Sequence, residues 1–486
     1  MSRSNDRGVS SDLFGGIKWS VYEVYGGQFI SLFITIILAR ILTPADFGLI
    51  GITLGVFSLT KSFISLGFTE AIIQNQTTSP SALNSIFILN LLMGILISIL
   101  FFFLSPSIAA YFGNKELEPI IKLLSIGNIL ESFVKVQTAL FSKKMDFKTL
   151  AIRKLTSQLI SGTVAVYLAL KGFGIYALAV QFLLGVMISS VLIWIQSSWR
   201  PRVQFSLNEL QLLRPVAQFS LATGLLNRAS KELFTFTIAK YTSLTQLGYY
   251  SKANSNVDFL INGVAASINK FLFPMLSSIQ IDNREFKQRF INVYNFSLII
   301  VLLLSSVCFV SADSIITTLL GNQWTESVFI FKCLLIRGVT ATHYSVVKSA
   351  ILAKSKLREG YIYDNLRRVV ELSSLIGLVF GGFNYFLFWF IAAQSINLFI
   401  QCILVNKAIG YSYSELMSFL TFNLIFTAAA ALFIDNRIDG FDSFIIQDLI
   451  KALFVFLLIV IKLFIFDLRL LKKVSKSAIT FIRTRH

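Results

Sequence analysis

Apolar runs of about twenty residues alternate with short polar segments along the whole chain, and a run of that length crosses a bilayer as one α-helix. A hydropathy window predicts an all-α membrane protein with about fourteen transmembrane helices. No polar stretch is long enough for a soluble catalytic domain. The predicted spans are 17–39, 47–68, 83–104, 117–141, 150–171, 174–197, 214–240, 246–273, 289–311, 326–353, 364–382, 384–406, 412–434 and 443–466.

The composition agrees with a chain that lies almost entirely in a membrane. Of its 486 residues, 55% are hydrophobic and 14% are charged, whereas a soluble domain has about a quarter charged residues. Polar residues at the start precede a full-length span, so we expect a retained anchor rather than a cleaved signal peptide. The three cysteines lie within apolar spans, where we expect free thiols that behave as small hydrophobes.

Basic residues are concentrated in alternate connecting segments. Lys and Arg collect on the cytoplasmic side of membrane proteins, which accounts for the net charge of +18 without nucleic acid. The opposite segments carry one base or none. This alternation predicts an even number of spans with both termini in the cytoplasm. The basic segments are 143–154, 200–214, 284–289, 354–368 and 469–485.

Two segments of the first half recur in the second half. Residues 39–48 align with 239–248 at an offset of 200, and residues 109–114 align with 317–322 at an offset of 208. Apolar sequences resemble one another in general, but these segments are loops that contain Gly, Asn and charged residues. An even number of predicted spans separates the matched helices. We therefore expect a parallel repeat with the binding site between its halves.

The same loops carry a resemblance to a known transporter family. The clearest motif is Leu-Ala-Arg-Ile-Leu-Thr-Pro-Ala-Asp-Phe-Gly-Leu at 38–49. The chain resembles the Wzx/WzxC-type oligosaccharide flippases, which are the polysaccharide transporter branch of the multidrug/oligosaccharidyl-lipid/polysaccharide exporter superfamily. The resemblance covers most of the chain and thins towards its end. Further matching segments are 19–20, Gln28, Phe63, 66–68, 71–74, 247–251, 273–274 and 319–324.

The resemblance implies a fold, a substrate and a location. The expected fold is two pseudo-symmetric six-helix bundles in a V, plus two C-terminal helices. The expected substrate is an oligosaccharide repeat unit on undecaprenyl diphosphate, moved across a bacterial inner membrane for lipopolysaccharide or exopolysaccharide synthesis. A polymerase and glycosyltransferases are the implied partners. The expected parts are an N-terminal bundle at 1–197, a cytoplasmic linker at 198–213, a C-terminal bundle at 214–407, and two helices with a basic tail at 408–486.

Such a flippase must pass an anionic head group through apolar surroundings, so charged and polar residues inside the spans are the candidates for its cavity. Lys61 lies in mid-span and has no acid within one turn. It either faces the cavity or pairs with an acid on a neighbouring helix, such as Glu23. Arg228 and Lys231 share one helical face and are suited to clamping a phosphate, unless Glu232 neutralises Arg228. The predicted substrate-binding residues are Lys61, Arg228, Lys231, Gln28 and Arg337.

Other ionisable residues inside the spans have structural interpretations. Glu131 and Lys135 have the spacing and order of a self-neutralising pair, and Arg367 and Glu371 have pair spacing too. His343 is either a polar packing residue or a group that titrates near neutral pH. Lys332 and Lys348 have no acid nearby on their own predicted helix, and Lys348 is expected to extend towards the interface.

The source of energy is open at this stage. No G-x-x-x-x-G-K-[ST] motif is present, so the chain itself is not expected to consume ATP. Coupling to a proton or sodium gradient requires a carboxylate in the pathway, for which Glu23 and Asp258 are the candidates. We expect no other cofactor and no metal site, because two histidines and three scattered cysteines form no ligand cluster.

Two other classes of protein compete with the flippase. An ion-coupled multidrug or organic-ion antiporter of the same superfamily is expected to have a cavity dominated by acids, whereas bases outnumber acids here. A membrane enzyme such as a repeat-unit polymerase is expected to have a large outer loop, and every predicted outer loop is short. No nucleophile elbow is present either. The sequence therefore favours a flippase that is not an enzyme.

Overall fold

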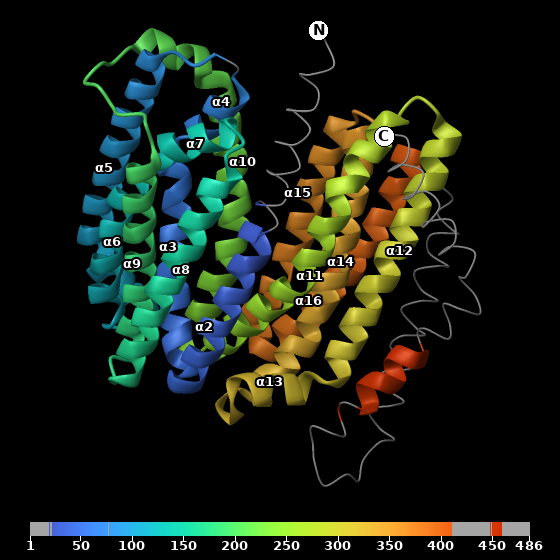
Figure 1. Cartoon of the computed structure of the whole chain (residues 1–486). Coiled ribbons are helices and arrows are strands. Elements are labelled where there is room, and N and C mark those ends of the chain that lie inside the picture. Colours follow the sequence, from blue (N-terminus) through green and yellow to red (C-terminus); the bar gives the residue numbers. More distant parts are fainter. Residues whose placement is uncertain (1–18, 20–21, 76, 411–447, 449, 459–486) are drawn as a thin grey trace. The chain divides into compact units, whose positions relative to one another are not determined.

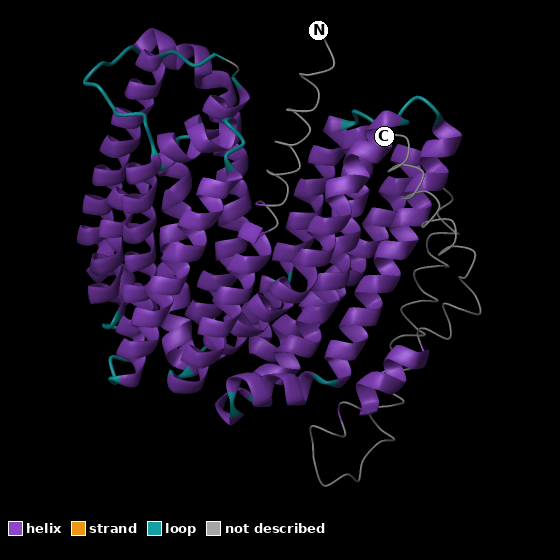
Figure 2. Cartoon of the chain, viewed as in Figure 1, coloured by secondary structure: helices purple, strands orange, loops and turns teal. Residues whose placement is uncertain are grey.

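The computed structural model describes residues 19, 22–75, 77–410, 448 and 450–458. Within these residues every regular element is a helix, as Figure 2 shows. Six of the helices are long and apolar enough to cross a membrane. The all-helical, multi-pass class predicted from the sequence is confirmed. The six are Tyr22–Ile41, Pro44–Ser65, Pro80–Phe112, Ile175–Gln196, Asn283–Val310 and Leu375–Lys407.

The chain forms two compact units, Met1–Gly248 and Tyr249–His486. Helix α11 begins in the first unit and continues into the second. Figure 1 labels the longer elements of both units. The first unit contains η1 (Tyr22–Gly26), α2 (Gly27–Ile41), α3 (Pro44–Ser65), α4 (Phe68–Gln74), α5 (Pro80–Phe112), α6 (Leu117–Ser132), α7 (Lys135–Lys143), α8 (Phe147–Leu170), α9 (Ile175–Gln196) and α10 (Leu207–Tyr241). The rest is α11 (Leu244–Ser278), α12 (Asn283–Val310), α13 (Ala312–Leu320), η2 (Asn322–Trp324), α14 (Ser327–Ala353), α15 (Leu357–Ser373) and α16 (Leu375–Ile409).

Local sequence explains where several helices begin. Thr43 caps α3 with its side chain, Asp46 returns the bond to the Thr43 backbone, and proline occupies the first helical position. The Ser79 side chain caps α5 by accepting a bond from the Ala82 backbone N–H, again before a proline. Asp282 caps α12 by accepting bonds from the backbone N–H groups of Glu285 and Arg284, and these bonds lower the pKa of its carboxyl group. Capping satisfies N–H groups that have no partner within the helix.

The structure has one break inside a predicted span and one kink between two predicted spans, and hydropathy alone reveals the form of neither. The span at 117–141 divides into α6 and α7 at Phe133 and Val134. In α16 the backbone leaves the helical conformation at Gly382, where φ is 80°. This kink falls between the two predicted spans 364–382 and 384–406. Glycine tolerates a positive φ because it has no Cβ, so the kink lies at the residue best able to adopt it.

The last two predicted spans are only partly covered by the structure. The span at 412–434 lies outside the described residues. In the span at 443–466, residue 448 and residues 450–458 are helical. The Asp448 carboxylate accepts a bond from the backbone N–H of Ser314 at 3.1 Å, at the start of α13. Val455 also packs with Val310. This helix therefore belongs to the packing of the second unit.

The repeated loops have the same local structure in both copies. At an offset of 200 residues, α2 and α10 end at Ile41 and Tyr241. The next helices, α3 and α11, begin three residues later in both copies. A hydroxyl group accepts a bond from the N–H three residues further on in each, at 3.3 Å from Asp46 to Thr43 and at 3.1 Å from Gln246 to Ser243. These equivalent caps are what a structural repeat predicts.

The two repeated loops also contact each other through glycine. A Cβ at Gly48 would lie 2.0 Å from the Leu244 carbonyl oxygen, and a Cβ at Gly248 would lie 1.8 Å from the Pro44 carbonyl oxygen. The two contacts are equivalent in the repeat, because Gly48 corresponds to Gly248 and Pro44 corresponds to Leu244. The backbones therefore approach as closely as only glycine allows, in an arrangement with local two-fold symmetry.

Helix α10 packs along α3 and α4 within the first unit. A Cβ at Gly67 would lie 2.0 Å from the Ala217 carbonyl oxygen, and Gly67 has the positive φ of a left-handed residue. Leu210, Leu213 and Ala217 of α10 join the core of this unit. By packing, the division therefore falls after Gly248 rather than within the predicted linker at 198–213. The predicted bundle limits and their V-shaped arrangement stay predictions.

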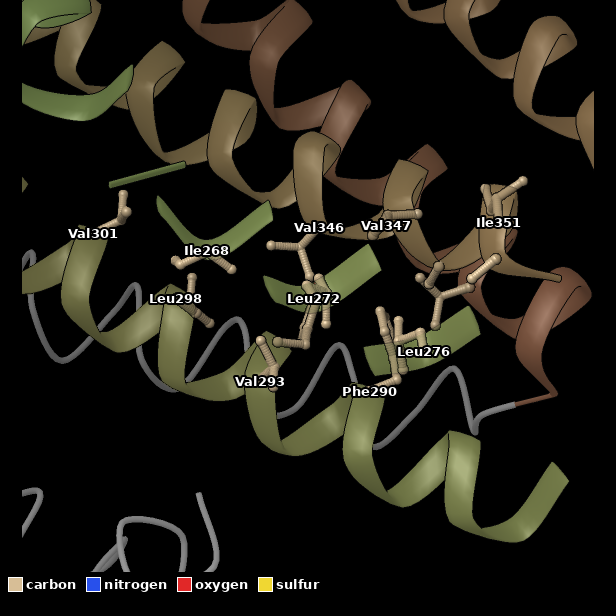
Figure 3. Packing of buried hydrophobic residues seen from close by; sticks show 14 of the residues in the cluster. Ile268, Leu272, Leu276, Phe290, Val293, Leu298, Val301, Val346, Val347 and Ile351 are labelled. Atoms are coloured by element: carbon tan, nitrogen blue, oxygen red, sulfur yellow. The ribbon is translucent and has the colours of Figure 1, made fainter. Parts of the chain in front are cut away.

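Each unit has its own apolar core. In the second unit the core joins α11, α12, α14 and α16, and Figure 3 shows part of it. Leu272 and Leu276 of α11 face Val293 of α12 and Val346 of α14 there. Tyr294 and Cys402 are buried in the same core.

Candidate functional site

The first unit contains a cluster of charges around one carboxylate. The Nζ atom of Lys135 lies 2.7 Å from Oε1 of Glu131, and the Nζ atom of Lys61 lies 3.9 Å from the same oxygen. Lys61 also lies over the rings of Phe57 and Phe182, at 5.4 and 6.0 Å from their centroids. The predicted Glu131–Lys135 pair is confirmed. The acid near Lys61 is Glu131 rather than Glu23.

Arg228 approaches the same part of α3 from α10. Its Nη1 atom donates a hydrogen bond of 3.4 Å to the carbonyl oxygen of Ser58, one turn before Lys61. Arg228 and Lys61 also interact electrostatically. A guanidinium group has five N–H donors, so this single long bond leaves most of them available. The two cations are thus held near each other inside the unit, although they are far apart in the sequence.

Glu232 does not neutralise Arg228, as one interpretation of the sequence predicted. Among the described residues no ion pair joins the two side chains. Glu232 is instead buried against α3, where its Oε2 atom lies 2.8 Å from the position of a Cβ on Gly55. The absence of a side chain on Gly55 provides the space for this carboxyl group. That interpretation of Arg228 is wrong for this physical reason.

The remaining candidates of the first unit lie at different depths. Lys231 is exposed on α10, whereas Gln28 is half-buried on α2. Glu23 lies in η1, a π-helical turn, which is a rare conformation that is frequent at functional sites. Arg153 of α8 interacts electrostatically with both Glu23 and Glu131, and it donates a bond of 3.1 Å to Thr138. Sequence reasoning assigned Arg153 to a cytoplasmic basic segment and missed this role.

Cations outnumber acids in this part of the first unit. Three basic side chains, Lys61, Lys135 and Arg153, interact with the two carboxylates Glu131 and Glu23, and Arg228 lies near Lys61 without an acid partner among the described residues. Such an excess inside apolar helices is costly unless an anion or water compensates for it. The arrangement therefore favours an anionic ligand. The members of this basic cluster are Lys61, Lys135, Arg153, Arg228, Glu131 and Glu23.

The candidates of the second unit neutralise each other. Nη2 of Arg337 lies 2.6 Å from Oδ1 of Asp258, with side-chain exposures of 21% and 31%. Asn254 donates a bond of 3.4 Å to the other Asp258 oxygen. One predicted substrate-binding residue and one predicted ion-coupling residue therefore form a single ion pair between α14 and α11. Because this ion pair has no net charge, it attracts an anionic substrate less than the basic cluster does.

The other bases of α14 also find acids on neighbouring helices. Lys332 pairs with Asp313 of α13 and Lys348 pairs with Asp364 of α15, each at 2.8 Å. The Asp364 partner of Lys348 was not predicted, and the extension of Lys348 towards the interface stays a prediction. On α15, Arg367 pairs with Glu371 at 2.8 Å, as their spacing predicted. The Lys and Arg side chains of α14 are thus each balanced by an acid.

A separate pocket of about 470 Å³ lies between α3, α5 and α10, a volume typical of ligand sites. Val56 of α3 and Leu233 of α10 line this pocket. At about 100° per residue, Val56 lies about 140° around the α3 axis from Lys61, and Leu233 lies the same angle around the α10 axis from Arg228. Lys240 is at its wall and donates a bond of 2.6 Å to the Tyr111 carbonyl oxygen. The pocket faces a different side of both helices from the basic cluster.

Comparison with known proteins identifies the family. A family model described as "Polysaccharide biosynthesis protein" matches residues 37–329, which is more than half of the chain. The chain belongs to this family of polysaccharide biosynthesis proteins. The match includes the repeated loops and the whole basic cluster except Glu23.

Individual relatives are distant in sequence. WzxC of Escherichia coli (strain K12), a lipopolysaccharide biosynthesis protein, is 22% identical over 415 residues, covering 82% of each chain. ExoT of Rhizobium meliloti (strain 1021), a succinoglycan biosynthesis transport protein, is 26% identical over 314 residues, covering 63% of this chain and 62% of ExoT. The matched part thus spans less than two thirds of ExoT.

Solved structures establish the fold. The lipid II flippase MurJ in an inward closed conformation matches with a TM-score of 0.72 and 14% identity, over 91% of this chain and 98% of MurJ. An inward-facing multidrug resistance MATE family transporter matches with a TM-score of 0.60 and 13% identity, over 81% of this chain and 96% of the transporter. The described helices therefore adopt the fold of these membrane transporters.

Proposed function

We propose that the chain is a flippase for oligosaccharide repeat units linked to undecaprenyl diphosphate. It moves them from the cytoplasmic to the outer face of a bacterial inner membrane for surface polysaccharide synthesis. The observation that carries this proposal is the excess of cations in the basic cluster, in a chain that belongs to a polysaccharide biosynthesis family. The similarity to ExoT, a succinoglycan biosynthesis transport protein, and to WzxC, a lipopolysaccharide biosynthesis protein, supports it.

The geometry of the cluster suggests how a diphosphate is held. Arg228 has free N–H donors and binds phosphate oxygens in pairs, while Lys61 adds a point charge. The distance of 3.9 Å from Lys61 to Glu131 is longer than a hydrogen bond, so Lys61 gives up little when it turns to an anion. Lys135 stays bonded to Glu131 at 2.7 Å. A ligand is therefore bound by two cations while a third remains in the structural pair.

Several parts of the proposal come from the sequence. The alternation of basic segments places both termini in the cytoplasm. The saccharide is transported by alternating access, in which the cavity opens to one face of the membrane at a time. The polymerase and glycosyltransferases of the same pathway are proposed partners. Transport makes or breaks no covalent bond, so the chain is not an enzyme.

The second candidate function is an ion-coupled antiporter for drugs or organic ions. The fold likeness to MATE transporters does not separate it from a flippase, because MurJ shares the fold. The charge of the basic cluster does separate them. An organic cation would be repelled by an excess of Lys and Arg, whereas a diphosphate is attracted. The antiporter is therefore the weaker proposal for this chain.

The proposal is tested in cells that depend on this chain for a surface polysaccharide. Loss of the chain, or the double change Arg228→Ala with Lys61→Ala, is expected to leave complete lipid-linked repeat units on the cytoplasmic face. The matched control is Lys171→Ala with Lys115→Ala, which removes two exposed lysines outside the cluster. The measurement is the amount of lipid-linked repeat unit on each face. Repeat units that still reach the outer face, with only polysaccharide length altered, would favour the polymerase alternative.

A further inference from the structure

Helix α14 carries polar side chains along most of its length. From Lys332 to Lys348 the helix rises by about 24 Å, at about 1.5 Å per residue. This is most of the hydrocarbon thickness of a bilayer, about 30 Å. At each end the base pairs with an acid of a neighbouring helix. The helix therefore carries polar groups through the membrane within the second unit.

Hydrogen bonds connect part of this helix to Glu371. Thr340 donates to the side-chain oxygen of Gln394 at 2.7 Å, and Gln394 donates to Glu371 at 3.4 Å. Gln401 donates to the carbonyl oxygen of Thr340 at 3.3 Å. Glu371 also interacts electrostatically with Arg337. A series of hydrogen bonds thus runs from Gln401 through Thr340 and Gln394 to the carboxylate of Glu371, beside the Arg337–Asp258 pair.

A second set of polar side chains, which shares Gln401 with this series, is buried with donor or acceptor atoms that lack hydrogen bonds to other described residues. All five members are 0–1% exposed. Seven of their donor or acceptor atoms have no partner among the described residues. Buried polar atoms normally have partners, so a concentration of exceptions in one core requires an explanation. The five are Tyr294, His343, Tyr363, Asn397 and Gln401.

These five residues lie close together, although they come from four helices. The rings of Tyr294 and His343 meet edge to face at 4.7 Å. Tyr294, Tyr363 and the Cys402 thiol are in electrostatic contact. Asn397 and Gln401 are one turn apart on α16, as are Thr340 and His343 on α14. Tyr294, and Cys402 next to Gln401, belong to the apolar core of the second unit, part of which Figure 3 shows.

Acidic and basic groups flank the site on the other side. The rings of Tyr363 and Tyr344 are 5.4 Å apart. The Tyr344 hydroxyl donates to Asp364, which pairs with Lys348. Arg367 lies over the Tyr344 ring at 4.5 Å. A carboxylate is therefore present at both ends of the unpaired group, Asp364 at one end and Glu371 at the other.

We propose that Tyr294, His343, Tyr363, Asn397 and Gln401 form a hydrated proton relay between Asp364 and Glu371. The inference rests on the proposed transport function, to which it adds a route for the coupling ion. Amide, phenol and imidazole groups both donate and accept hydrogen bonds, which suits them to ordering water. A dehydrated metal cation prefers carboxylate oxygens, and none is among the five. Water is therefore the better occupant.

The relay conserves charge at each step. A proton that enters on Asp364 passes to water, and each water or phenol that accepts a proton releases another from the same oxygen, while His343 accepts on one ring nitrogen and releases from the other. The Asn397 and Gln401 amides position the water and carry no proton themselves. The last proton is taken up by Glu371. Only O–H and N–H bonds form and break, and no redox partner is needed. This route differs from the two carboxylates that the sequence indicated, Glu23 and Asp258.

The test uses the full chain in vesicles of phosphatidylethanolamine and phosphatidylglycerol in sodium-free buffer. Proton entry under an imposed pH gradient is followed with a pH-sensitive dye trapped inside. Tyr294→Phe with Tyr363→Phe is expected to slow proton entry by about tenfold or more, because it removes two positioned proton carriers. The matched control is Tyr361→Phe with Tyr385→Phe, which removes two exposed phenol groups of the same unit and is expected to leave the rate unchanged.

A loss of proton entry in the double tyrosine variant would not be due to misfolding. The change from tyrosine to phenylalanine keeps both buried rings and removes only hydroxyl groups, which have no partner among the described residues, so the variant is expected to fold, as thermal unfolding will check. The relay is overturned if the double variant passes protons at the wild-type rate. It is also overturned if the wild-type chain passes none, or passes them only when sodium is added.

The relay and the flippase can fail separately. If lipid-linked units reach the outer face in cells without this chain, while the purified chain still passes protons through Tyr294 and Tyr363, the flippase fails and the relay stands. If units accumulate on the cytoplasmic face in those cells and proton entry is insensitive to the two tyrosines, the relay fails and the flippase stands.

Discussion

At the scale of single residues, the distinctive feature is that one carboxylate, that of Glu131, is the counter-ion of two ammonium groups. Glu131 lies 2.7 Å from Lys135 and 3.9 Å from Lys61, and its side chain is 17% exposed. A charge inside a membrane is stable only when it is paired or solvated. Glu131 therefore holds the basic cluster together, and it sets how much positive charge remains for a ligand.

This role predicts a loss of stability when the acid is neutralised. Glu131→Gln leaves two partly buried ammonium groups without a counter-ion and is expected to lower the free energy of unfolding by about 3 kcal/mol. The control is Glu118→Gln on the same helix, which breaks a pair of the same spacing but with about twice the exposure. That change is expected to cost less than about 1 kcal/mol. Denaturation in detergent compares the two, and equal losses would show that Glu131 has no special role.

Much of the local pairing followed from sequence spacing, and the rest did not. The Glu131–Lys135 and Arg367–Glu371 pairs are one turn apart on a helix, so their spacing alone revealed them. The partner of Arg337 is 79 residues away on α11, and no local pattern marks it. Residues that meet across helices are placed by tertiary packing, which hydropathy does not report.

At the scale of helices, the closest approaches depend on glycine. The repeated loops meet where Gly48 and Gly248 leave no room for a side chain beside the opposite carbonyl oxygen. The sequence revealed the repeat because its loops kept Gly and capping residues. It did not reveal that the two copies touch, nor that α10 packs with α3 in the first unit. Those features depend on contacts that are not local in the chain.

The contact predicts a steric effect that is specific to position. Gly48→Ala places a Cβ 2.0 Å from a backbone oxygen, which cannot be relieved by moving a side chain, so α3 and α11 must separate. A loss of about 1–3 kcal/mol is expected, the usual cost of overpacking. Gly224→Ala on α10 is the matched control, since its Cβ would meet only Ser62 at 3.5 Å.

Thermal unfolding measures both glycine variants in the same detergent. The control is expected to be neutral or slightly stabilising, because alanine favours helix more than glycine. If Gly48→Ala unfolds at the same temperature as Gly224→Ala, the close contact of the repeated loops is not a feature of the folded protein.

At the scale of the whole molecule, the two units differ in how they treat charge. The first unit gathers an excess of cations around Glu131, and the second pairs each base of α14 with an acid. The described residues thus provide a cationic cluster in one unit and paired charges along α14 in the other. This division is what the proposed flippase and the proposed proton relay require.

The all-helical class, the multi-pass character and the family were predictable from the sequence, because hydropathy and loop motifs carry them. The separate roles of the two units were not. Lys61, Arg228 and Arg337 looked alike as charges inside apolar spans, yet only the first two lie in the cationic cluster. Their difference lies in the acids that face them across helices.

The central claim is that the basic cluster moves a diphosphate-linked saccharide across a membrane. Its most direct test is the transfer of labelled undecaprenyl-diphosphate-linked oligosaccharide between the leaflets of vesicles that contain only the purified chain. The wild-type chain is expected to transfer it. The Arg228→Ala, Lys61→Ala double variant is expected to be slower by about a hundredfold, as befits the loss of two charge-assisted contacts. Transfer at the wild-type rate by the double variant would contradict the account.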